Sequence, residues 1–464
     1  MMRVRLIAVV LLSAATGAAQ EPSRRYSRPV VPTTAALDRL HLVLAWRSYL
    51  PMDGLRDGIE HVQRLGNQLL VQLRSGTVIS LDAETGQIRW QTRLGVAYHV
   101  GVPPGHNDTL VLIANGTRLF ALDRATGRQL WEFDMPNVPS TPPVADADKL
   151  YLCFNGGQFD VYQLPPRPAA VSPGPQLPTA ADLSDARKGR RGLNLSAYGQ
   201  YSNIADHYRR TTGTPQPHFL FEHRTETHVT EAPMLSAQAI TLVGGEGSFF
   251  VSSKDGRRPL GRYHLDLAPA APLGHHGPMI YVAGKDGTIA AISTLTGKTI
   301  WRFHVAAATV FRRLEVTDED VFAASDSAGL YRLRRDTGEL VWHTPAAHRF
   351  LARNRQYVYA LDRTGRLLVL DLARGTPLGA LDTRDFTVAV SNEVTDRIYL
   401  GAHDGLLLAL HDRNLRQPLV LKSEAAPKPT DPPAARPAEA PVLPSRPNPP
   451  AENNQAMENK AGDK

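Results

Sequence analysis

All five tryptophans of the 464-residue chain fall in the same slot of one repeated sequence unit. Trp90 ends the run GTVISLDAETGQIRW, and Trp131 ends GTRLFALDRATGRQLW. Trp301 and Trp342 end two related runs, whereas Trp46 stands in LVLAWRSYLP, which contains only the end of the unit. A period of about 40 residues built from short strands and turns predicts a β-propeller, because each unit is one blade that must stack on its neighbours to bury its apolar faces.

The residues within one unit explain how such a blade would fold. The apolar run 77–83 predicts a strand buried on both faces, as expected between two neighbouring blades. Asp82 and Thr85 can hydrogen-bond the amides of the following turn, and Gly86 supplies a positive φ that residues with a Cβ adopt reluctantly. Trp90 then offers a large apolar surface and one N–H, which suits it to join one blade to the next.

The repeated positions can be counted along the chain. The glycine before the buried strand recurs at Gly76, Gly116, Gly157, Gly247, Gly287, Gly329, Gly365 and Gly405. The turn glycine recurs at Gly86, Gly127, Gly256, Gly297, Gly338 and Gly375. Eight outer-strand slots follow the same spacing: Trp46, Trp90, Trp131, Phe221, Leu260, Trp301, Trp342 and Gly379. The two sets of eight match only if Trp46 belongs to the last unit.

We therefore predict an all-β fold, an eight-bladed β-propeller of four-stranded antiparallel blades over residues 39–422. The strand around Ala45–Leu50 would complete the blade begun by residues 384–412 and would close the ring. Closure removes the exposed sheet edges that an open array would leave. A seven-bladed ring is the alternative, and it would require the run QPLVLKS to complete the last blade itself.

One interval between units is out of step and marks an insertion. Gly157 and Gly247 are 90 residues apart, and the extra length is the Pro-rich, basic stretch 165–217 in the third blade. Phe221 stands 26 residues before Gly247, the spacing that Trp90 has from its own following glycine, so Phe221 takes the tryptophan slot. The insertion carries a net charge of +4 out of +7 for the whole chain. The ring itself is nearly neutral, which argues against a nucleic-acid-binding face.

The insertion is a candidate protein interface. Arginine beside aromatic residues is common at interfaces, and a basic cluster attracts acidic partners or anionic lipid. The default interpretation of such a charge cluster is a solvated loop. The candidate interface residues are Arg187, Lys188, Arg190, Arg191, Tyr198, Tyr201 and Tyr208.

The two ends of the chain predict export and a tail. Residues 1–20 have a basic start at Arg3 and Arg5, a short apolar run and small residues near Ala19, as in a secretory signal peptide. We expect cleavage there, with an uncleaved anchor as the alternative, and no transmembrane span in the periplasmic or secreted protein. Residues 21–38 are predicted to be a linker, and residues 423–464, rich in Pro and charge, a disordered tail.

Three further residues invite a chemical role. Cys153 is the only cysteine and lies in the apolar run LYLCFNGG, so a buried, inert thiol is expected. His275 and His276 are adjacent, and adjacent side chains diverge on a strand, so we expect a loop between blades and no metal site. We identify no catalytic, cofactor-binding or metal-binding residues.

The units resemble the PQQ-like β-propeller repeat, found in quinoprotein alcohol dehydrogenases and in the BamB-type outer-membrane assembly factor. The resemblance rests on LDAETGQIRW, LDRATGRQLW, STLTGKTIW and RRDTGELVW and covers most of residues 40–415 at the level of repeat spacing. The resemblance to the BamB type implies contact with the outer-membrane assembly machinery. With the signal peptide and the absence of catalytic clusters in the sequence, we expect a monomeric, non-enzymatic scaffold that binds a protein partner. The alternatives are a propeller that binds a small ligand or glycan and a PQQ-dependent dehydrogenase, which commonly has a vicinal disulfide that a single cysteine cannot form.

Overall fold

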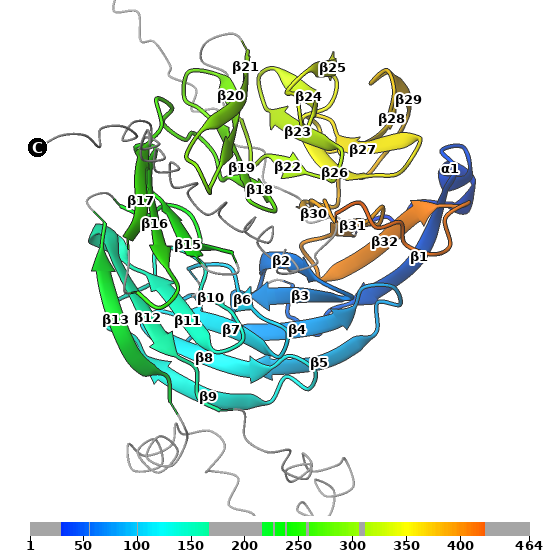
Figure 1. The fold of residues 1–464 in the computed structure, drawn as a ribbon. Helices are drawn as coiled ribbons and strands as arrows, with labels where there is room; N and C mark the ends of the chain where they lie inside the picture. Colours follow the sequence, from blue (N-terminus) through cyan, green and yellow to red (C-terminus); the bar gives the residue numbers. More distant parts are fainter. Residues whose placement is uncertain are drawn as a thin grey trace, which may run out of the picture. The chain divides into compact units, whose positions relative to one another are not determined.

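The computed structural model describes residues 29–54, 56–99, 101–166, 216–225, 228–236, 239–256, 259–305 and 311–422. The chain divides into a compact unit Met1–Glu424 and a second unit Ala425–Lys464, which lies wholly outside the described residues. The described residues form eight four-stranded antiparallel sheets arranged as the blades of a β-propeller, which confirms the predicted fold class (Figure 1).

Seven of the blades take four consecutive strands of the chain in spatial order. The first blade contains β2 (Ile59–Leu65), β3 (Gln68–Leu73), β4 (Thr77–Asp82) and β5 (Ile88–Arg93), and the second contains β6 (Gly105–His106), β7 (Leu110–Asn115), β8 (Arg118–Asp123) and β9 (Gln129–Asp134). The third blade contains β10 (Val144–Ala145), β11 (Lys149–Cys153), β12 (Gln158–Gln163) and β13 (His218–Arg224). The fourth contains β14 (Met234–Leu235), β15 (Ala239–Val243), β16 (Ser248–Ser253) and β17 (Pro259–His264). A 3₁₀ turn, Asn155–Gly157, precedes β12.

The fifth blade contains β18 (Gly274–His276), β19 (Met279–Ala283), β20 (Thr288–Ser293) and β21 (Thr299–His304). The sixth contains β22 (Glu315–Val316), β23 (Asp320–Ser325), β24 (Gly329–Arg334) and β25 (Leu340–Thr344). The seventh contains β26 (Arg349–Arg353), β27 (Tyr357–Leu361), β28 (Leu367–Asp371) and β29 (Pro377–Leu381). The eighth blade combines β30 (Val388–Val390), β31 (Ile398–Gly401) and β32 (Leu406–Asp412) with β1 (Leu42–Tyr49).

The start of the chain closes the ring. β1 pairs antiparallel with β32, and Trp46 lies opposite Ala409 in the register, as predicted. Figure 1 shows β1 alongside β32 although the two strands come from opposite ends of the propeller sequence. The seven-bladed alternative is wrong, since the run 417–422 does not complete the last blade.

Burial along each blade follows the layer that each strand occupies. β4 and β8 are buried along almost their whole length, whereas in the outer strand β5 only Trp90 is buried. First strands of several neighbouring blades contact one another, as β6 does β10 and β18 does β22. The first strands therefore line the axis, and the fourth strands form the rim.

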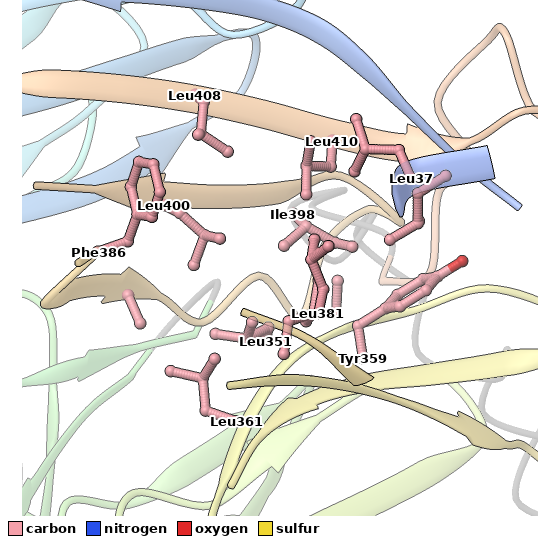
Figure 2. Packing of buried hydrophobic residues seen from close by; sticks show 14 of the residues in the cluster. Leu37, Leu351, Tyr359, Leu361, Leu381, Phe386, Ile398, Leu400, Leu408 and Leu410 are labelled. Atoms are coloured by element: carbon pink, nitrogen blue, oxygen red, sulfur yellow. The ribbon is translucent and has the colours of Figure 1, made fainter. Parts of the chain in front are cut away.

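A short helix lies within the predicted linker 21–38. α1 (Thr34–Asp38) begins after Thr33, whose hydroxyl accepts a hydrogen bond from the Ala36 amide. Leu37 of α1 is buried in the cluster that joins the seventh and eighth blades (Figure 2). The segment before β1 thus packs on the ring and supports its closure.

Candidate functional site: blade seams, rim and axis

The interface between neighbouring blades, here called the seam, is built from the repeated tryptophan and the turn glycine of the next blade. Trp90 packs over Gly127 so closely that a Cβ at Gly127 would lie 2.7 Å from Trp90 Cγ and closer still to other ring atoms. The indole N–H of Trp90 donates to Arg124 O at 3.0 Å, in the same turn. The tryptophan therefore binds the adjacent turn through both its apolar face and its one donor.

The same arrangement recurs around the ring. The indole N–H groups of Trp46, Trp301 and Trp342 donate to Ala83 O, Arg335 O and Leu372 O at 2.9, 2.8 and 2.8 Å. The residues paired across seams are Trp46 with Gly86, Trp301 with Gly338, Trp342 with Gly375, and Phe221 with Gly256. Trp131 lies with Leu150, Leu152 and Leu164 in the cluster between the second and third blades.

The turn between the third and fourth strands is held by its aspartate. Asp82 Oδ1 accepts hydrogen bonds from the Glu84 and Thr85 amides at 3.0 and 2.9 Å. Gly86 follows with φ +70°, a conformation that glycine adopts without a Cβ penalty. The LDxxTG sequence thus fixes the turn on which the neighbouring aromatic ring rests.

Two seams have no aromatic residue in the slot, and other side chains fill the space. The register of β17 places Gly261, rather than Leu260, in the slot, and the ring of Tyr263 covers Gly297 instead. In β29 the slot is Gly379, as the spacing indicates, and Leu40 occupies the space above it. The slot shifts because Gly261 is the fifth residue after the turn glycine Gly256, whereas Trp301 is the fourth after Gly297. Leu260 itself is the extra residue of a β-bulge.

This bulge recurs on the rim and turns apolar side chains outward. The extra residue of the bulge is Leu220 in β13, Leu260 in β17, Ile300 in β21 and Leu378 in β29. All four are exposed, with Ile300 at 56% and Leu378 at 57%. Outer strands with such residues offer both an open sheet edge and an apolar contact to another chain.

Ionisable side chains from several blades meet at the axis. Glu315 begins β22, Arg313 precedes it, and Glu393 follows β30, with Arg313 Nη2 3.6 Å from Glu393 Oε1. Lys422 Nζ donates to Glu393 Oε1 at 2.6 Å, and the Val316 amide donates to Glu393 Oε2 at 2.9 Å. We call Glu231, Arg313, Glu315, Glu393 and Lys422 the axial cluster.

Burial and charge set the titration of this cluster. Burial raises the pKa of Glu315 to about 7 against the attraction of Arg313. Burial also raises the pKa of Glu231 to about 7. At Glu393 burial acts in the same direction, but Lys422 and Arg313 outweigh it and lower the pKa. Glu393 is therefore fully ionised at neutral pH, whereas Glu231 and Glu315 are partly protonated.

His275 and His276 lie in strand β18, not in a loop between blades as expected from the sequence. The surrounding protein lowers the pKa of His275 to about 4 by desolvation, and the charges of Lys422 and Arg313 act in the same direction. The Nε2 atom of His276 lies 2.6 Å from Asp318 Oδ1. Among the described residues, no group of three or more His, Cys, Asp or Glu side chains is placed to hold a metal ion.

Of the remaining residues singled out from the sequence, the structure describes Cys153 but not the candidate interface. Cys153 is fully buried, as expected, and burial raises the pKa of its thiol to about 12. The candidate interface lies outside the described residues: Arg187, Lys188, Arg190, Arg191, Tyr198, Tyr201 and Tyr208. The axial cluster was not predicted, because a 40-residue period does not show which charged residues meet at the axis.

The sequence matches a family model described as outer membrane protein assembly factor BamB over residues 35–164 and 231–417, together more than half of the chain. The chain belongs to the BamB family. This match and the eight-bladed ring confirm the resemblance to the PQQ-like, BamB-type repeat. None of the curated proteins matches the sequence.

Two solved structures share the fold of this BamB-family chain. BamB from Moraxella catarrhalis is 16% identical, with a TM-score of 0.53, and the match covers 80% of this chain and 97% of that one. The computationally designed Ika8 protein is 15% identical, with a TM-score of 0.52, covering 77% and 96%. A designed protein shares the architecture as closely as the natural one, so the fold alone does not select a function.

Proposed function

We propose that this protein is an exported, non-enzymatic scaffold that binds protein partners and takes part in outer-membrane protein assembly. The observation that carries the proposal is the BamB family match across both halves of the ring. The expected signal peptide at residues 1–20 supports export to the periplasm. Within the described residues, no helix has the length and apolar character needed to cross a membrane.

The rim supports binding of extended polypeptide. Each fourth strand leaves one edge without a neighbouring strand of its own blade, and unfolded outer-membrane proteins are rich in alternating β-segments. Strand addition would use the backbone for affinity and the exposed Ile300 and Leu378 for apolar contacts. The bulge beside each residue limits pairing to short segments, which favours reversible binding over aggregation.

Site-specific photocrosslinking tests the scaffold function directly. A photoreactive residue at Ile300 or Leu378 of the full exported chain is expected to yield crosslinks to proteins of the outer-membrane assembly machinery or to their substrates. The matched control places the same group at Val30, which is exposed but lies outside the strands. Equal products from the control and rim positions, or no protein product at all, would count against the scaffold.

A spectroscopic assay separates the scaffold from the enzyme. Purified protein mixed with PQQ and Ca²⁺ is expected to show no quinone-dependent dye reduction with alcohol substrates. Sustained turnover under these conditions would replace the scaffold with a dehydrogenase. Gel filtration of the same sample is expected to give a monomer, because the ring is closed by its own first strand.

A further inference from the structure

The segment after β32 does not join a blade, because β1 already holds the fourth position in the sheet. Residues 413–422 instead run back across the ring. The buried guanidinium of Arg397 donates to Leu415 O at 3.1 Å and to Arg416 O at 2.7 Å. Arg397 also pairs with Asp396, which fixes the point where the segment leaves the last blade.

The next residues lie as an extended strand against the loop between β30 and β31. Val420 forms an antiparallel bridge with Thr395, and the Leu421 amide donates to Val394 O at 2.7 Å. The Leu419 amide donates to Asp396 Oδ1 at 2.8 Å. On the opposite side, the Asp318 amide in the sixth blade donates to Leu421 O at 2.9 Å. The segment therefore joins two blades that are not neighbours in the ring.

Two consecutive side chains anchor the segment. Leu421 and Lys422 are 5% and 8% exposed, whereas Val420 between the bridging amides is 64% exposed. Lys422 reaches the axial cluster and donates to Glu393 at 2.6 Å. The segment therefore exposes Val420 and buries the two side chains that follow it.

The amine of Lys422 neutralises the carboxylate of Glu393 within the axial cluster. Glu393 is ionised and buried, and without Lys422 its remaining cationic neighbour is Arg313 at 3.6 Å, which Glu315 and Glu231 also attract. His275 faces the same cluster and is neutral at pH 7 because burial lowers its pKa. A buried carboxylate left with incomplete pairing is costly, so the site favours an occupant that brings a cation.

We propose that the axial face carries a peptide-binding site for an extended segment with an apolar residue followed by lysine, and that residues 415–422 occupy it as a built-in competitor. The recognition elements are the backbone of residues 394–396, the buried position taken by Leu421 and the carboxylate of Glu393. A partner with the same pattern would bind by displacing the chain's own segment. This inference does not depend on the assembly role, because it is read out on the purified protein.

Hydrogen exchange on full-length variants tests the docking. Leu421→Asp places a charge at a buried position and is expected to speed exchange of the Leu419 and Leu421 amides by about tenfold or more. The matched control Val420→Asp adds the same charge at an exposed position and should leave both amides protected as in the wild type. Equal loss of protection in the two variants would overturn the anchoring by Leu421.

A labelled peptide with the sequence LRQPLVLKSE tests binding in trans by fluorescence anisotropy. It is expected to bind the full-length Leu421→Asp variant saturably and the wild type far more weakly, since the wild type is self-occupied. Replacing the peptide's lysine by methionine should weaken binding by about tenfold, the loss of one charge-assisted hydrogen bond. Equal uptake by wild type and variant, or none by an undocked variant, would refute the site.

Lys422→Met in the full chain covers the case in which Leu421→Asp does not fold. This variant keeps the apolar anchor and is expected to bind the lysine peptide more tightly than the wild type does. Protection of the Leu421 amide unchanged from wild type, with no peptide binding, would show that Lys422 is no anchor.

Discussion

The contact between Trp90 and Gly127 yields the sharpest stability prediction. In Gly127→Ala the new Cβ meets two obstacles. The backbone at φ +70° costs an L-residue about 1–2 kcal/mol, and overlap with the Trp90 ring costs about 1–3 kcal/mol more. The expected loss in the free energy of unfolding is therefore about 2–5 kcal/mol.

Gly277→Ala is the matched control, because Gly277 has φ +54° and a Cβ added there would have no heavy atom within 4 Å. It should cost only the backbone part, about 1–2 kcal/mol. Urea unfolding followed by far-UV circular dichroism measures both variants, and the comparison is valid if the slope with urea is unchanged. In a Trp90→Ala background, Gly127→Ala should cost no more than the control. Equal costs for Gly127→Ala and Gly277→Ala in the wild-type background would refute the seam contact.

Three further predictions concern other parts of the ring. Leu40→Ala, which empties the space above Gly379, should lower the free energy of unfolding by about 1–2 kcal/mol in urea titrations, because Leu40 is only partly buried; no change would mean that Leu40 does not fill the slot. Glu315 has its pKa raised by burial from 4.5 to about 7, so its stabilising contribution is complete below about pH 4.5 and is lost as pH rises through about 7. Glu315→Gln should remove up to about 3 kcal/mol of the decrease in the free energy of unfolding between about pH 4.5 and 7. A variant whose stability depends on pH as the wild type's does would contradict the burial of a carboxyl at this position. Cys153 should resist alkylation in the native protein, because burial raises its pKa to about 12; fast labelling would place it at an accessible surface.

Much of the fold follows from the repeat. Trp46 without a preceding half-unit favours closure by the first strand, and β1 pairs with β32 as that reasoning predicts. The turn chemistry of Asp82 and Gly86 was also predictable, since both act within a few residues of sequence. Interactions between residues close in sequence can therefore be predicted from the sequence alone.

The departures have a common physical cause, which is contact between distant parts of the chain. Leu40 and Tyr263 fill seams where the local sequence offers only glycine in the slot. Lys422 joins Glu393 at the axis, although the sequence around it resembles the start of a tail. Periodicity predicts which residues repeat, but it does not show which side chains from different blades meet.

Ring closure by the first strand is the claim on which the account depends, and a disulfide across β1 and β32 tests it most directly. Val43 and His411 are register partners, and paired antiparallel residues have Cα atoms about 4.5–5.5 Å apart, within the range of a disulfide. Full-length Val43→Cys/His411→Cys, oxidised in the folded state, is expected to form the crosslink nearly completely and to retain the wild-type circular dichroism spectrum. Val43→Cys/Leu260→Cys, with its second cysteine in the fourth blade, should not crosslink. Absence of the bond in the first pair, or equal crosslinking in both, would contradict a ring closed by its own first strand.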